Sequence, residues 1–171
     1  MLEKPDSGPG HYLRDLVYGG LDGVITTLAV VAGVSGASLS TDVALILGVA
    51  NLAADGISMG ASNYLGLKSE LEQTGQSVKE EQPIRHGFAT FLAFVVAGSV
   101  PLASYMVPLG TNGRLVTAAV LSAVTLWIIG AARARFLPGG VFRYGMEMLI
   151  IGGVAAAVAY LFGAGVEALV T

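Results

Sequence analysis

The chain is 171 residues long, and 54% of its residues are hydrophobic while only 12% are charged. The charged share is roughly half that of an ordinary soluble domain, which excludes a protein whose surface faces mainly water. The absence of cysteine excludes disulfides, thiolate metal sites and cysteine nucleophiles, and the scattered Lys and Arg, with a net charge of −3, exclude a nucleic-acid partner. We therefore expect an all-α integral membrane protein whose main partner is the lipid bilayer.

Residues 1–15 are polar and lack the short apolar core and cleavage site of a signal peptide. We expect them to be a polar cytoplasmic N-terminus at the start of the mature chain. The remainder, residues 16–171, is expected to form one transmembrane domain.

Five apolar stretches are long enough to cross a bilayer, whose core of roughly 30 Å needs about 20 helical residues. They alternate with short connections, and only the polar segment 67–86 is sizeable, so we expect it to be a short cytoplasmic loop. The expected transmembrane helices cover approximately residues 16–37, 42–66, 87–108, 115–133 and 145–168.

Lys and Arg divide unevenly between the two ends of these spans. Eight of the nine precede the first span, follow the second or lie between the fourth and fifth, and only Arg114 lies on the other side. Because cytoplasmic connections carry an excess of positive charge, the N-terminus is predicted to be cytoplasmic and the C-terminus to lie outside or in a lumen.

Two aspartates lie within the spans, Asp22 in the first and Asp55 in the second. An ionised carboxylate in the middle of a span costs on the order of 2.5–3.5 kcal/mol, so such residues usually face an ion path or a partner charge. The alternatives are a carboxylate near the headgroups and a protonated one bonded to a neighbouring helix. We interpret both as candidate ion-path residues.

The second span adds further polar residues at helical spacing around Asp55, which predicts one shared face. Counting about 1.5 Å per residue from Arg14 and Lys68 places Asp22 and Met59 at one level, roughly 12–13 Å into the membrane. Carboxylate, amide and thioether ligands together suit a first-row divalent ion such as Fe²⁺ or Mn²⁺, although a lone methionine is more often packing filler. The candidate metal ligands are Asp22, Met59, Asp55 and Asn51, with Ser58 and Ser62 as weaker candidates on the same face.

Other polar residues carry weaker signals. Glu70 and Glu72 in segment 67–86, and Glu147 near one end of the fifth span, are weak metal candidates for which solvation is the simpler interpretation. His11 and His86 lie in polar flanks, too far apart for a local metal motif, and are expected to be solvated. No catalytic constellation is visible, so we expect neither an enzyme nor a permanently bound cofactor.

The segments GGLDGVITTLAVVAGVSGA, ILGVANLAADGISMGASNYLGLKSE and GMEMLIIGGVAAAVAYLFG together resemble the vacuolar iron transporter family. The resemblance spans nearly the whole chain. It implies a homodimeric five-helix fold that exports Fe²⁺, and often Mn²⁺, from the cytoplasm in exchange for protons, with Asp22 and Met59 on the transport path. The short segment 67–86 departs from the glutamate-rich helical domain of many members, and Asn51 and Asn63 stand where relatives frequently have an acidic residue.

Two functional hypotheses follow. The first is a divalent-metal/proton exchanger, and the second is a non-transporting membrane subunit that keeps the family fold within a larger membrane complex. A homodimer packed through the first two helices is expected from the pairs Gly19/Gly23 and Gly56/Gly60, which could instead serve packing within one subunit. The expected location is the cell inner membrane in a bacterium or a vacuolar-type membrane in a eukaryote.

Overall fold

The computed structural model describes residues 10–170, apart from the side chains of Glu80, Thr111 and Asn112. Within this range the chain is helical and no strand occurs. The elements are α1 (Leu13–Gly36), α2 (Thr41–Thr74), α3 (Val78–Glu81), α4 (Pro83–Leu102), the 3₁₀ helix η1 (Ala103–Met106), α5 (Thr111–Arg133) and α6 (Val141–Val170).

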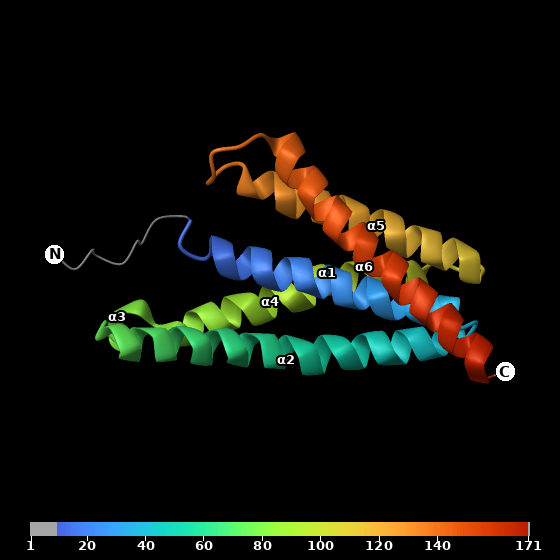
Figure 1. Cartoon of the computed structure of the whole chain (residues 1–171), viewed down its shortest axis with the longest axis horizontal. Helices are drawn as coiled ribbons and strands as arrows, with labels where there is room; N and C mark the ends of the chain where they lie inside the picture. Colours follow the sequence, from blue (N-terminus) through green and yellow to red (C-terminus); the bar gives the residue numbers. More distant parts are fainter. Residues whose placement is uncertain (1–9, 171) are drawn as a thin grey trace.

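Five of these segments are long and apolar enough to cross a membrane: α1, α2, α4 with η1, α5 and α6. The prediction of an all-α chain with five transmembrane helices is therefore confirmed for the described residues, and the protein is a multi-pass membrane protein. Successive long helices run in opposite directions (Figure 1), so α1 begins at the same end as α3 and the α5–α6 connection, while α6 ends at the other.

Helix α1 is the centre of the bundle and contacts α2, α4, α5 and α6. Its buried residues Leu28 and Val31 join Phe94 of α4 and Leu52 of α2 in the main apolar cluster. Helix α2 packs on α1 and α4 and leaves its remaining side exposed, as its position at the edge of the bundle shows (Figure 1). Among the described residues, α2 therefore has an outer side without a partner, and so do α5 and α6.

Segment 67–86, expected to be a loop, is largely helical. Helix α2 continues to Thr74, and the short α3 occupies Val78–Glu81 before α4 begins at Pro83. The sequence KSELEQT contains mostly good helix formers, and α2 is capped after Thr74 by Gly75, whose left-handed φ of 67° suits a glycine C-cap. Helix α2 therefore extends beyond the length that a bilayer core requires.

The glycine pairs from which a dimer was expected pack against another helix of the same chain. A Cβ atom at Gly19 or Gly23 of α1 would collide with the backbone of α4. A Cβ at Gly60 of α2 would come within 2.8 Å of the carbonyl oxygen of Gly87 in α4, and Gly56 faces side chains of the same helix. These glycines let α1 and α2 approach α4 closely, which is the alternative that the sequence left open.

Candidate functional site

The two membrane aspartates face each other across α1 and α2. Both side chains are half-buried, and the hydrogen bonds Asn51–Thr26 and Arg14–Asn63 between the two helices place them at one level. Two carboxylates at close range repel each other when both are ionised, and a divalent cation or protons between them remove that repulsion.

Hydrogen bonds between α1 and α2 fix their register on either side of this pair. Asn51 donates from Nδ2 to Thr26 Oγ1 at 3.4 Å, and Thr26 Oγ1 in turn donates to the backbone oxygen of Asp22 at 2.8 Å. Toward the start of α1, Arg14 donates from Nη2 to Asn63 Oδ1 at 3.3 Å. The two helices thus run antiparallel, with Asn51 one turn beyond the aspartates and Asn63 two turns before them.

This register places Asp55, and not Met59, opposite Asp22. Met59 lies one turn closer to Arg14, so the expectation that it is level with Asp22 is wrong by about one turn. The depth count took Lys68 as the end of the second span, whereas α2 continues to Thr74, so Arg14 and Lys68 do not mark the same level.

Met59 packs against the main apolar cluster, to which α1, α2, α4 and α5 contribute. Its side chain is half-buried, which leaves part of it beside Asp55 one turn away on the same helix. Packing accounts for this methionine, and its position also leaves it available as a thioether ligand.

The residues of the expected polar face of α2 differ in their exposure. Asn51, Asp55 and Met59 are half-buried next to the stripe that packs on α1 and α4, whereas Ser58 and Ser62 are exposed. Within one chain the two serines face outward, so the polar face is open on one side.

The remaining candidates lie at the helix ends. Glu70 and Glu72 are exposed, and Glu72 forms an i,i+4 ion pair with Lys68 at 3.8 Å. Glu147 is paired with Arg133 at 3.1 Å next to the α5–α6 connection. None of the three is brought near the paired aspartates by a contact recorded among the described residues.

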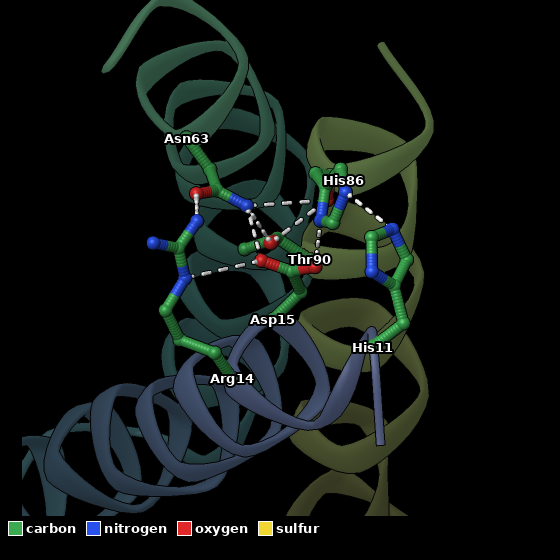
Figure 2. A network of polar contacts seen from close by, with 6 residues as sticks. All are labelled: His11, Arg14, Asp15, Asn63, His86 and Thr90. Atoms are coloured by element: carbon green, nitrogen blue, oxygen red, sulfur yellow. Dashed lines mark hydrogen bonds and ion pairs between the residues drawn. The ribbon is translucent and has the colours of Figure 1, made fainter. Parts of the chain in front are cut away.

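A buried polar network that sequence reasoning missed lies at the end where α1 begins (Figure 2). Asp15 is only 1% exposed and lies 2.5 Å from Nδ1 of His86, which is 4% exposed. Asp15 is also bound by Asn63, which donates from Nδ2 at 2.8 Å, and by Arg14 at 3.6 Å. The expectation that His86 is solvated is therefore wrong, because α4 starts deep enough to bury its first turn against α1 and α2.

His11 completes this network from the residues that precede α1. Its Nε2 lies 3.1 Å from Nε2 of His86, and its ring lies edge-on to that of His86 (Figure 2). Asn63 also contacts Thr90 Oγ1 at 2.7 Å, one turn after His86 on α4. The four-residue spacing of His86 and Thr90 places both on one side of a helix, and this was the sequence signal for a polar contact. It could not identify Asp15 on α1 as the partner.

Comparison with known proteins matches this chain to the VIT family model over residues 13–83 and 72–164. The chain belongs to the VIT family. It is 26% identical to vacuolar iron transporter 1 of Eucalyptus grandis over 211 aligned residues, which cover 88% of this chain and 85% of the relative. It is also 26% identical to the vacuolar iron transporter of Toxoplasma gondii, with 94% and 76% of the two chains covered.

A shorter match to the vacuolar iron transporter of Centaurea cyanus reaches 40% identity over 73 residues, or 43% of this chain. The alignment with the Eucalyptus relative is longer than this chain, so that relative carries segments with no counterpart in this VIT family member. The two segments matched by the family model meet at residues 72–83, where α2 gives way to α3 and α4.

Proposed function

We propose that this VIT family member transports divalent Fe²⁺ and Mn²⁺ out of the cytoplasm in exchange for protons. The observation that carries the proposal is the helix register that places Asp22 and Asp55 opposite each other on two membrane-spanning helices. Carboxylates inside a membrane are expensive and mark ion and proton paths. The names of the relatives, which are vacuolar iron transporters, support iron as the cargo.

The residues around the pair supply a mixed ligand set. Asp22 and Asp55 provide charged oxygens, Asn51 provides an amide oxygen one turn away, and Met59 provides a thioether on the other side. Because hard oxygen ligands dominate and one soft ligand is added, the set suits a borderline divalent ion better than Mg²⁺ or Cu⁺. Selectivity for Fe²⁺ over Mg²⁺ would then depend on the sulfur of Met59.

Exchange follows from the charge of the site. One divalent ion and two protons each cancel the charge of two carboxylates, so the paired aspartates reach the same net charge with either occupant. With either occupant bound, the two negative charges are neutralised while they lie within the bilayer. A lower pH on the side opposite the cytoplasm would drive metal release there.

A second copy of the chain would complete the site. Asp55 lies at the edge of the exposed side of α2, where Ser58 and Ser62 face outward. A polar surface of this kind facing lipid is costly, and a partner helix would enclose it. We therefore propose a homodimer packed through α2, with the glycines of α1 and α2 retained for packing within each subunit.

Metal flux into proteoliposomes with an imposed pH gradient tests the exchanger. Wild-type protein should carry Fe²⁺ and Mn²⁺ at a rate that rises with the gradient, and Asp22→Asn combined with Asp55→Asn should abolish that flux. Asp42→Asn is the matched control, because Asp42 is an exposed aspartate at the start of α2. If wild-type protein carries no metal under any gradient, the proposal fails and a non-transporting membrane subunit takes its place.

A further inference from the structure

Three metal-ligating side chains from separate elements meet at the end of the bundle where α1 begins. They are His11 before α1, Glu81 at the end of α3 and His86 in the first turns of α4. One ligand atom from each lies within 4.8 Å of the others, and the two imidazole Nε2 atoms are 3.1 Å apart. In a tetrahedral site with bonds of about 2.0–2.1 Å, two nitrogen ligands lie roughly 3.3 Å apart.

The orientation of His86 favours binding of a metal ion. Its Nδ1 contacts the buried carboxylate of Asp15, which is itself fixed by Asn63 and Arg14. When the Nδ1–H group of the neutral imidazole donates a hydrogen bond to Asp15, Nε2 carries the free lone pair. This Nε2 points toward His11 (Figure 2). A carboxylate behind a histidine in this way sets the tautomer of metal-ligating histidines and increases their basicity.

We propose that His11, Glu81 and His86 form a binding site for a divalent first-row transition-metal ion, with Asp15 as the carboxylate that orients His86. Two imidazoles and one carboxylate suit Fe²⁺, Co²⁺ and Zn²⁺, and leave at least one coordination position for water. The bound ion would tie the residues before α1 to the α3–α4 junction.

This site is separate from the paired aspartates. Asp22 lies seven residues beyond Asp15 on α1, which is roughly 10 Å along the helix axis. Glu81 and His86 belong to the short connection and the start of α4, neither of which contributes to the pair. The proposed site therefore does not depend on transport, and metal binding can be measured when flux is absent.

Co²⁺ titration of the purified full-length protein tests the site, with visible ligand-field absorption and calorimetry as readouts. The background is Asp22→Asn with Asp55→Asn, which removes the paired aspartates. We expect this background protein to bind one Co²⁺ per chain with tetrahedral or five-coordinate absorption, and His11→Ala or Glu81→Gln to lower the affinity at least tenfold. Both substituted side chains are only half-buried, so folding should be retained.

Controls separate the site from general effects. Asp42→Asn removes one exposed charge at the far end of α2 and should leave the affinity within about twofold of the background protein. Asp15→Asn should lower the affinity roughly tenfold or more, as loss of an orienting carboxylate does. No Co²⁺ binding by the background protein, or binding unchanged by both His11→Ala and Glu81→Gln, would overturn the proposal and leave a hydrogen-bonded imidazole pair.

Discussion

At the scale of single residues, two carboxylates lie where the bilayer makes a negative charge costly. Asp22 and Asp55 interact across α1 and α2, and each lies within a membrane-spanning helix. Their mutual repulsion destabilises the empty, fully ionised state. Removing one charge should therefore affect transport and stability in opposite directions.

Asp55→Asn is expected to lower Fe²⁺ flux about tenfold or more, since the loss of 1.4 kcal/mol of binding is already a tenfold change. The thermal unfolding midpoint in detergent should stay unchanged or rise, because the repulsion with Asp22 is gone. The remaining flux should depend less on the pH gradient, because one exchangeable proton is lost. Wild-type flux and pH dependence in this variant would remove Asp55 from the path.

Two substitutions of Met59 can separate a role of its sulfur in metal binding from its role in packing. Met59→Ala should lower stability by about 1–2 kcal/mol, because the side chain is half-buried against the apolar cluster. Met59→Leu keeps the approximate volume and should cost less than about 1.5 kcal/mol. If the thioether is a ligand, Fe²⁺ flux falls in both variants. Normal flux in Met59→Leu would mean that packing is its only role.

Asn63 supports the buried Asp15 network. Its amide nitrogen lies 2.8 Å from Asp15 Oδ1 and 2.7 Å from Thr90 Oγ1. Asn63→Leu should cost about 2–3 kcal/mol or more, because a buried carboxylate loses a hydrogen-bond donor. Chemical denaturation in detergent measures this cost. The exposed Ser99→Leu on α4 is the control, and an equal effect in both variants would argue against the network.

At the scale of elements, α4 is the helix on which α1 and α2 converge through glycine. The approach at Gly23 places α1 against the backbone of Phe94, so there is no room for even one added methyl group. Side chains at such crossings are limited by backbone atoms, which cannot move without shifting a whole helix.

Gly23→Ala should therefore lower the thermal unfolding midpoint, at a cost of about 2 kcal/mol or more. Gly66→Ala is the matched control on α2, because nothing lies within 4 Å of a Cβ at that position. There the change should be neutral or stabilise by up to about 1 kcal/mol through helix propensity. Equal midpoints for the two variants would show that the α1–α4 approach is looser than described.

At the scale of the whole molecule, the five long helices alternate in direction, and most basic residues near their ends therefore lie at one end of the bundle. Arg14, Lys68, Arg85 and Arg133 lie at the end where α1 begins, and Arg114 lies near the start of α5 at the opposite end. Because positive charge is enriched on the cytoplasmic side, we propose that the α1 end faces the cytoplasm. The proposed histidine site and the entrance to the path would then both face the cytoplasm.

Single introduced cysteines test both orientation and assembly, since the native chain has none. Gln76→Cys, beside α3, should react with impermeant reagents only from the cytoplasmic side, and Leu169→Cys only from the opposite side. Labelling of both from one side would contradict the orientation.

Cross-linking measures the proposed dimer through α2. Ser62→Cys should form a disulfide between two copies in proteoliposomes, because its side chain is exposed on the open side of α2. Leu161→Cys on α6 is exposed as well and should not cross-link. A monomeric mass in nanodiscs together with no cross-linking at Ser62→Cys would contradict the dimer.

The sequence by itself determined the features that depend on local composition. The length and hydropathy of each span predicted five transmembrane helices, because each spanning helix satisfies its own backbone within the bilayer. The same local logic identified Asp22 and Asp55 as charges inside spans, and the residue pattern of the first two spans indicated the family.

Only the tertiary structure decided which side chains meet. Helix register placed Asp55 opposite Asp22 and moved Met59 by one turn, because α2 extends beyond the span that hydropathy defines. Burial of His86 against Asp15 required the start of α4 to pack between α1 and α2, which are far from it in sequence. Rotation and register depend on contacts between distant segments, so no pattern within one helix could supply them.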